Sequence, residues 1–365
     1  MSAPPGGEHL PARPSQPARA GASRRTVVLV VVVLAGLFIG ALGQLVQVPY
    51  VIFSPGPAQD TLGKINGKDI VSVKGTKTYP TSGELDFTTV SLYGGPDHPV
   101  SVWRYLRAKT DSNSEILPEE DVFGDKTSKE IKDESSAAMT GSQQSAEVVA
   151  VRATGAKVTE KVYVGGVEEG SPAVGKLKAR DLIQEIDGKP IPSIDSVQTV
   201  MGKVKPGATV KVTVMREGSA RTVSVKTRNV EGRAVMGIRI APRFDFPFEV
   251  KINAGEVGGP SAGLMFSLAI YDKLTPGALT RGKNFAGTGE IAFDGTVGPI
   301  GGIQQKLVGA RSSGADYFLS PAQNCPEVKG HVPEGLKVFK VGTFDEAKNV
   351  VEKVAAGTTA GLPTC

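Results

Sequence analysis

Cysteine and histidine are scarce in this chain of 365 residues. It has two cysteines, Cys325 and Cys365, and three histidines, His9, His98 and His331. These residues form no C-x-x-C pair and no H-E-x-x-H motif, which are common signatures of zinc sites and redox-active thiols. The sequence therefore predicts neither a metal site nor a cofactor.

Positive charge is also sparse outside the N-terminus. The net charge is +5, but residues 1–25 hold four arginines against one glutamate, a net +3 that leaves only +2 for the rest. Binding to DNA or RNA needs a clustered basic face, so we expect no nucleic-acid partner. With 40% hydrophobic and 22% charged residues, the chain can bury the cores of two or three domains.

One long run near the N-terminus has no charge at all. Residues 27–43 read VVLVVVVLAGLFIGALG, and the apolar character continues to Val48. About 20 apolar residues suffice to cross a bilayer as a helix. We therefore predict a single transmembrane helix over residues 26–48.

Two arginines, Arg24 and Arg25, precede the apolar run and set its predicted orientation. By the positive-inside rule residues 1–25 stay in the cytoplasm, and the composition of this arm predicts disorder. Everything after the helix is then expected outside the cytoplasm. The alternative is a cleaved signal peptide, because Ala-Leu-Gly at residues 41–43 suits a signal peptidase; the length of the run favours the uncleaved anchor.

Residues 49–152 follow the apolar run and begin with short β-like segments. Apolar residues alternate in 69–73 and 87–92, which is typical of strands. Residues 109–137 are polar and mostly acidic without a regular period, so we expect a surface loop there. Residues 137–151 have helical periodicity.

A compact β-rich unit occupies residues 161–228. It reads as a strand, a Gly-Ser-Pro-Ala turn, an Asp-Gly hairpin, a helix over 193–204 and two final strands. This order, and the string GSPA…LKARDLIQEIDGKPI, resemble PDZ domains. The resemblance implies a PDZ-like domain over residues 153–228 that binds peptides.

PDZ domains take up a peptide as an extra strand and contact its side chains with a helix. The resemblance implies that a peptide lies beside residues 161–165. The residues expected to contact it are Val162, Tyr163, Val164, Val197, Val200 and Met201. A loop rich in glycine, which would capture a terminal carboxylate, is poor here because Gly155 stands alone, and a spacer without any ligand is the alternative.

Residues 170–176 (GSPAVGK) match most of a phosphate-binding loop. However, Leu177 stands where a Ser or Thr would hold Mg²⁺, and Pro172 lies in the middle of the stretch. We interpret it as a turn and a helix start, so it does not predict an ATP site.

Ser261 stands at the predicted start of an apolar helix face. Pro260 precedes it, and proline favours the first position of a helix. Backbone N–H groups at such a start lack partners, so together with Gly258 and Gly259 they could hold a developing oxyanion. A serine that only caps the helix is the alternative.

A lysine lies on the apolar face of a second predicted helix, after Gly301 and Gly302. Ile303, Lys306 and Leu307 share that face. Such a lysine usually extends its amine to water. If the amine is buried instead, its pKa falls from about 10.4 toward neutrality, and the neutral amine can take a proton from a serine hydroxyl.

Three motifs around these residues resemble the proteolytic domain of the Lon family. They are GPSAG at 259–263, GTGEI at 287–291 and GTVGPIGGIQQKLVGA at 295–310. The resemblance covers about residues 250–353. It implies that Ser261 is the nucleophile, Lys306 the general base and Thr288 a hydroxyl that orients the lysine.

Earlier stretches, residues 83–87 and 139–152, resemble the opening strands and first helix of the same domain, so the PDZ-like domain would be inserted within it. The expected fold class is α+β. The expected organisation is a cytoplasmic arm (1–25), a transmembrane helix (26–48), a β-rich region with the first part of the Lon-like domain (49–152), the PDZ-like domain (153–228), the rest of the Lon-like domain (229–354) and a C-terminal tail (355–365).

Two rival functions must be weighed. GPSAG also fits the G-x-S-x-G motif of α/β-hydrolase esterases, and Asp316 and His331 follow Ser261 in the matching order. That motif needs a strand running into the serine, which the glycines before Pro260 disfavour. A PDZ scaffold without catalysis is the second rival, but both residues of the Ser–Lys dyad are present.

The favoured prediction is a membrane-anchored serine endopeptidase that works without ATP on extracytoplasmic proteins or peptides. No ATPase module accompanies the Lon-like motifs. The expected partners are the substrates and the membrane, and formation of a homo-oligomer stays open. Cys325 and Cys365 are predicted to form a disulfide, because both face the oxidising side and no other cysteine competes.

Overall fold

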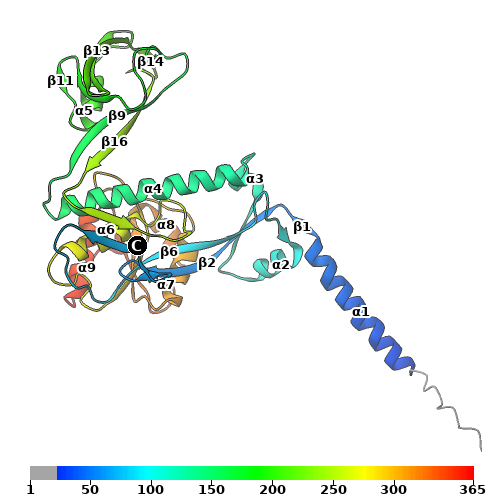
Figure 1. Ribbon diagram of the computed structural model, residues 1–365. Helices are drawn as coiled ribbons and strands as arrows, with labels where there is room; N and C mark the ends of the chain where they lie inside the picture. The colour runs from blue at the N-terminus through cyan, green and yellow to red at the C-terminus, as the bar shows by residue number, and fades with distance from the viewer. Residues whose placement is uncertain (1–22) are drawn as a thin grey trace, which may run out of the picture.

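The computed structural model describes residues 23–365, and Figure 1 shows two folded units attached to one projecting helix. Residues 1–22, which hold most of the predicted cytoplasmic arm, lie outside the described residues. The projecting helix α1 (Arg24–Leu45) is long and apolar enough to cross a membrane, a test that an anchor and a signal sequence both pass. It ends three residues before the predicted span does, because the chain turns extended at Val46.

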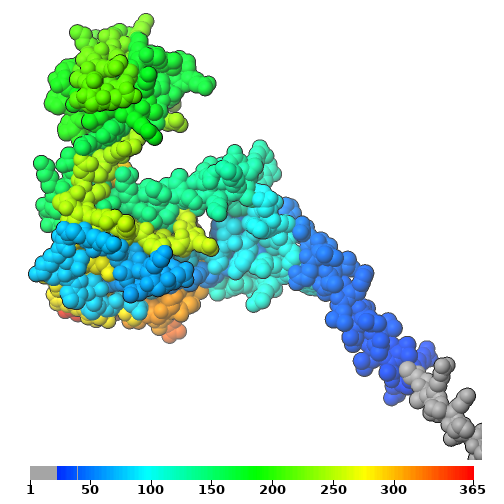
Figure 2. Space-filling view, viewed as in Figure 1, coloured from blue at the N-terminus to red at the C-terminus, as the bar shows by residue number. Residues whose placement is uncertain are grey.

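The larger unit, here called the body, comprises residues 47–153 and 246–365. The smaller unit, the module, comprises residues 154–245 and stands away from the body (Figure 2). Two paired strands connect it to the body (Figure 1). The chain enters the module from a helix of the body and returns to a strand of the body. This arrangement confirms the α+β class and the predicted insertion of one domain in the other.

The body is built on a mixed sheet of six strands, of which four are parallel. β2 pairs antiparallel with β6, and β8 pairs antiparallel with β2 at the edge of the sheet. The order across the sheet is β22 (Lys337–Val341), β21 (Tyr317–Pro321), β18 (Asn284–Gly287), β6 (Glu84–Tyr93), β2 (Tyr50–Asp60) and β8 (Glu115–Pro118).

Helices cover both faces of this sheet because successive side chains of a strand point to opposite sides. In β6, Leu85 and Phe87 join one core, which holds α4 (Ser128–Ala153), α6 (Gly263–Leu274) and α9 (Phe344–Ala355). On the other face α7 (Ile303–Ser312) packs on Ala286 and Phe318. The two helices that carry the predicted dyad therefore lie on opposite faces of one sheet.

Shorter elements complete the body. Four two-stranded pairs are β1 with β7, β3 with β4, β5 with β17 and β19 with β20. The bounds are β1 (Gln47–Val48), β3 (Lys64–Ile65), β4 (Lys68–Asp69), β5 (Val71–Lys74), β7 (Val100–Ser101), α2 (Val102–Thr110), α3 (Glu119–Phe123), β17 (Glu249–Ile252), β19 (Glu290–Ile291), β20 (Val297–Gly298), a 3₁₀ turn η1 (Ala322–Asn324) and α8 (Cys325–Val328).

The module is a β-sheet with one helix, α5 (Ile194–Met201), over its core. Its strands run in the order β13, β12, β10, β9 and β16, with β11 beside β10. The bounds are β9 (Thr159–Val167), β10 (Leu182–Ile186), β11 (Lys189–Pro190), β12 (Thr209–Arg216), β13 (Ser219–Lys226), β14 (Arg228–Val230), β15 (Arg233–Val235) and β16 (Ile238–Asp245).

Two predictions about the extent of domains and elements need correction. The module extends past residue 228, because β16 pairs with β9 along its whole length. The expected loop over 109–137 contains β8, α3 and the first ten residues of α4, whose start is fixed by a capping box between Thr127 and Glu130. The tail is ordered: Thr364 bridges to Phe339 of β22.

Candidate active site

Ser261 lies in the turn that leads into α6, not inside the helix. The helix begins at Gly263, with Ala262 as its N-cap, so the predicted start at Pro260 is slightly early. Two hydrogen bonds fix the backbone on either side of the serine. Ser142 Oγ of α4 donates to the carbonyl of Pro260 (2.7 Å), and the N–H of Gly289 donates to the carbonyl of Ser261 (2.8 Å).

Lys306 reaches Ser261 from the opposite face of the sheet. Its Nζ lies 2.8 Å from Ser261 Oγ, and the side chain is 4% exposed. α7 comes close enough because Gly309 has no side chain: a Cβ there would lie 2.3 Å from the carbonyl oxygen of Gly56 in β2. Burial lowers the pKa of Lys306 from 10.5 to about 8, and the charge of Glu290 opposes this shift.

Thr288 joins the same cluster at the end of β18. Its Oγ1 lies 3.1 Å from Lys306 Nζ and donates to the carbonyl of Ser261 (3.0 Å). The side chain is fully buried. One hydroxyl thus touches the lysine amine and the serine backbone at once, which limits the orientations open to the amine.

The cluster opens onto a cleft of about 750 Å³. Ser261 and Lys306 both line it, so the serine oxygen faces a space that an extended peptide could enter. Apolar side chains supply much of the remaining wall, namely Phe53, Leu117, Met139, Val257 and Ile300.

The predicted oxyanion donors must be revised. The N–H of Gly259 donates to the carbonyl of Ser135 in α4 (3.0 Å) and is not free to bind an oxyanion. Gly258 also faces α4, because a Cβ on it would lie 2.0 Å from Ser135 Oγ. Among the described residues the N–H groups of Gly258, Ser261 and Ala262 have no backbone partner, and all three residues line the cleft.

The esterase triad is wrong. Asp316 pairs with Arg311 (3.5 Å), and His331 is an exposed residue whose Nδ1 contacts the carbonyl of Lys329 (3.1 Å). Within residues 23–365 neither side chain hydrogen-bonds to Ser261. His331 lines a different hollow from the one that Ser261 opens onto.

The predicted peptide site beside residues 161–165 is also wrong. β9 has β10 on one side and β16 on the other, so its backbone cannot accept a further strand. Val162 and Val164 belong to the core of the module, and Tyr163 lies under the guanidinium of Arg243 (5.1 Å). Val197 and Val200 of α5 are buried in that core as well, and Met201 is half-buried against it. The edge strand of the described sheet on this side is β16.

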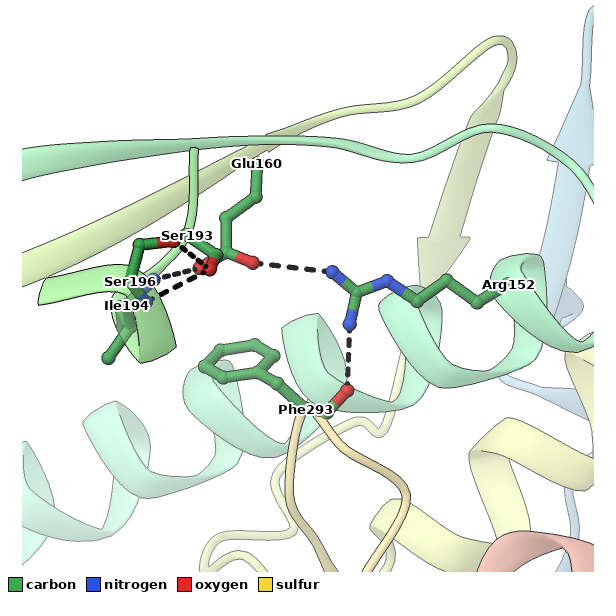
Figure 3. Close-up of polar contacts among 6 residues, drawn as sticks. All are labelled: Arg152, Glu160, Ser193, Ile194, Ser196 and Phe293. Carbon is green, nitrogen blue, oxygen red and sulfur yellow. Dashed lines mark hydrogen bonds and ion pairs between the residues drawn. The ribbon is translucent and has the colours of Figure 1, made fainter. Parts of the chain in front are cut away.

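Figure 3 shows a junction between body and module. Arg152, in the last turn of α4, donates to the carbonyl of Phe293 (3.0 Å) and to the carboxylate of Glu160 in β9 (3.3 Å). Glu160 also accepts the N–H of Ile194, the first residue of α5 (2.9 Å). Phe293 lies between β19 and β20, in the hairpin that follows Thr288. One arginine therefore links the module to the active-site hairpin.

The two cysteines are joined in a disulfide, with their Cα atoms 4.9 Å apart. Cys325 begins α8, and Cys365 follows the residue that bridges to β22. The bond ties the end of the chain to the face of the sheet that carries α7. Whether the thiols are oxidised in the cell stays a prediction.

Sequence reasoning missed the part that α4 plays. Ser135 and Ser142 brace the turn before Ser261 from one helix face, and the small residues of Ser135–Ser145 could have indicated a close approach. No group of three or more His, Cys, Asp or Glu side chains is placed to hold a metal ion in the described part of the chain.

Comparison with known proteins supports both resemblances. Residues 138–227 match the PDZ domain family, and residues 184–356 match the Lon protease (S16) C-terminal proteolytic domain. The two matches overlap in sequence, as expected where one domain interrupts another. A domain of the second kind is a peptidase with a Ser–Lys dyad.

Several individual proteins are similar to parts of this chain. Lon protease 1 of Sorangium cellulosum is 34% identical over 137 residues, which are 37% of this chain and 16% of that protein. Lon protease 1 of Bacillus subtilis is 31% identical over 141 residues, 36% of this chain and 17% of that protein. The chain thus spans about a sixth of the length of these curated relatives. The crystal structure of the PDZ domain of the SdrC-like protein from Listeria innocua is 34% identical, covers 22% of this chain and 92% of that chain, and has a TM-score of 0.21.

Proposed function

We propose that this chain, which carries a PDZ domain and a Lon protease (S16) C-terminal proteolytic domain, is a membrane-anchored endopeptidase that cuts extracytoplasmic proteins without ATP. One observation carries the proposal. A buried lysine amine without a carboxylate partner within 4 Å among the described residues lies 2.8 Å from a serine hydroxyl at the wall of a cleft. Burying an amine without a counter-ion costs free energy and favours its neutral form, and a neutral amine beside a serine hydroxyl can act as a general base.

The proposed reaction begins with Lys306 in its neutral form. Its Nζ takes the proton of Ser261 as Oγ attacks the carbonyl carbon of the peptide bond. The N–H groups of Ser261 and Ala262 are the candidates to hold the oxyanion. Lys306 then gives the proton to the departing amine, and a water molecule, activated in the same way, releases the acyl group from the serine.

Thr288 is proposed to position the lysine. Its contacts with both Lys306 Nζ and the carbonyl of Ser261 hold the amine toward the serine hydroxyl. Thr288 is therefore a positioning residue, because the attacking and proton-accepting atoms belong to the other two.

Independence from ATP is supported by the structure of residues 170–176, the stretch whose sequence resembles a phosphate-binding loop. Residues 170–176 make turns between β9 and β10 of the module, where a phosphate loop would connect a strand to a full helix. The cleft beside Ser261 suits chain segments that are already extended.

Anchorage rather than removal of α1 is supported by its packing. Trp103 of α2 donates to the carbonyl of Gly40 (2.9 Å), and its ring occupies the space that a side chain at Gly43 would need. The next residues form β1, which pairs with β7 of the body. Cleavage after Gly43 would remove the helix surface on which Trp103 packs.

The module is proposed to bind peptide segments of substrates along β16. This strand has only β9 as a neighbour in the described sheet, so its other edge has backbone groups to offer. Ile238 and Ile240 of β16 are only partly buried against the core of the module. A peptide paired with β16 would lie beside an apolar surface.

The test uses the intact chain in nanodiscs with an unstructured protein substrate such as β-casein. We expect cleavage at the same rate with and without ATP. Ser261→Ala should lower the rate by about a thousand-fold or more. His331→Ala, a matched control from the rejected triad, should cleave like the unchanged chain. Full activity of Ser261→Ala, or loss of activity in His331→Ala, would refute the Ser–Lys mechanism.

A further inference from the structure

We propose that the pocket between the outer end of α1 and helix α2 binds the phosphate headgroup of an anionic phospholipid. The pocket is a hollow of about 500 Å³ on the side of the body that faces α1. Polar and aromatic residues make up most of its lining, namely Gln44, Ser54, Tyr93, Ser101, Trp103, Arg104, Arg107, Asp111 and Ser114. Figure 1 shows α2 beside the end of α1, far from the module.

The position of the pocket matches the headgroup layer. A helix of 22 residues is ~33 Å long, close to the ~30 Å of a bilayer's hydrocarbon core. Gln44 lies in its last turn, so the pocket lies at the depth where headgroups begin. Trp103, which bonds to Gly40 one turn lower, is at the level where tryptophan is enriched in membrane proteins.

The charge of the pocket suits a phosphate. Neither Arg104 nor Arg107 has a carboxylate within 4 Å among residues 23–365. Asp111, the acid on the rim, already accepts the N–H of Asn113 (3.0 Å) and the hydroxyl of Ser114 (2.8 Å). The guanidinium groups of both arginines are therefore not paired with a carboxylate of the described chain. Their N–H groups can donate hydrogen bonds to the oxygens of a phosphate.

The surroundings of the pocket suit acyl chains rather than water. Three large apolar side chains of this region are exposed, namely Tyr93 (43%), Trp103 (39%) and Leu106 (45%). The guanidinium of Arg104 lies over the ring of Tyr93 at 4.3 Å, so the basic and apolar parts are contiguous. They continue into α1, where the large apolar side chains of residues 27–34 and of Leu37, Phe38, Leu42 and Leu45 are exposed. Only a lipid offers a phosphate and hydrocarbon in that order at the end of a membrane span.

This inference rests on the proposed anchorage of α1 and is independent of the peptidase. Binding of a headgroup there would hold α2, and through β7 and β1 the body, at a fixed height above the bilayer. The cleft of Ser261 would then keep one orientation toward the membrane surface.

Trp103 is the only tryptophan in the sequence, so its fluorescence reports on the pocket without labelling. The intact chain is placed in phosphatidylcholine nanodiscs, and phosphatidylglycerol with brominated acyl chains is added as the quencher. Brominated phosphatidylcholine is the reference. We expect brominated phosphatidylglycerol to reach half-maximal quenching at about a ten-fold lower mole fraction, because each arginine near the surface favours anionic lipid.

Two double variants of equal charge locate the effect. Arg104→Ala/Arg107→Ala should abolish the difference between the two lipids. Arg221→Ala/Lys226→Ala removes two exposed positive charges from β13 of the module and should leave the difference intact. Thermal melts of both variants check that the fold is retained.

Several results would overturn the proposal. Equal quenching by the two lipids, or loss of the preference in both variants, would mean that the pocket is not a lipid site. Reversal of the quenching by inorganic phosphate would assign the pocket to a soluble anion. A chain that is cleaved after Gly43, shown by N-terminal sequencing, would refute the anchorage itself, whereas an intact chain without lipid preference would refute the pocket alone.

Discussion

The body and the module each bury a charged side chain, and they treat it in opposite ways. In the module Asp181 is 1% exposed, and both of its oxygens accept hydrogen bonds from Arg216, each at 2.6 Å. In the body Lys306 is 4% exposed, and its amine meets only the hydroxyls of Ser261 and Thr288.

The difference indicates that the charge of Asp181 has a structural role, whereas the amine of Lys306 has a role in the reaction. Burial disfavours the ionised form of Asp181, but the hydrogen bonds from Arg216 outweigh it and lower the pKa of the carboxyl group. The same kind of burial acts on Lys306 without a counter-ion in contact, so its pKa falls to about 8. The module pairs its buried carboxylate with an arginine, whereas the body keeps the amine beside Ser261 without a counter-ion in contact, as a general base requires.

The largest effect is expected from Lys306→Arg, which keeps the positive charge but cannot become neutral. Hydrolysis of a peptide should fall by about a thousand-fold or more, because no group is left to take the proton of Ser261. Rates on a fluorogenic peptide measure it. Lys348→Arg, at a half-exposed site on α9, is the control and should not change the rate. Substantial turnover by Lys306→Arg would show that Lys306 is not the general base.

Asp181→Ala tests the structural role of the buried ion pair in the module. It leaves Arg216 without its partner in a largely buried place, and we expect the module to lose about 3 kcal/mol of unfolding free energy. Hydrogen exchange of the amides in β9 and β10 should speed up while cleavage of short peptides stays unchanged. Asp345→Ala, which breaks an exposed pair with Lys348, should cost no more than about 0.5 kcal/mol. A peptidase defect in Asp181→Ala would show that this charge is not purely structural.

The pKa of Lys306 predicts the pH profile. Only the neutral amine acts as a base, so kcat/KM should rise about ten-fold per pH unit below pH 8 and level off above it. Stability should also rise between pH 8 and 10.5, because there the unfolded chain keeps a proton that folded Lys306 has released. Initial rates of peptide hydrolysis at constant ionic strength measure the pH dependence of kcat/KM. A profile that peaks in acid would contradict the lysine as the base.

The smallest effect is expected from Cys365→Ser. The disulfide spans 40 residues, for which chain entropy predicts roughly 3–4 kcal/mol. We expect about 2 kcal/mol, because without the bond the chain end can fray in the folded state and regain part of that entropy. The loss should appear in the unfolding of the body and not in the module, which has no cysteine. Urea titrations with and without reductant compare the two units. Equal destabilisation of both would contradict this assignment.

What the sequence could predict follows from how local each signal is. Ser261, Thr288 and Lys306 stand in short glycine-rich motifs whose geometry is set within a few residues, and the structure brings the three together. The signal for the apolar helix α1 is equally local, because about twenty apolar residues need no partner to be recognised.

Two of the failures depended on distant partners. The peptide edge was assigned to β9 because nothing in residues 161–165 reveals that β16, more than 70 positions later, occupies that side. Gly259 was predicted to have a free N–H because its acceptor, Ser135, comes from another segment. The start of α4 was missed for a different reason: its first ten residues are mostly exposed, so they have no apolar period, although the capping box of Thr127 and Glu130 was present.

The paired strands that carry the module have a consequence for how such a protein can change over generations. Thr159 and Asp245 are direct partners in the ladder of β9 and β16, so the inserted domain begins and ends at one place on its host. A gene can therefore gain, lose or exchange the whole insert at a single point without separating the halves of the catalytic sheet. Recognition and chemistry are thus inherited as separable parts, and a new target preference can arise while the cutting machinery stays the same.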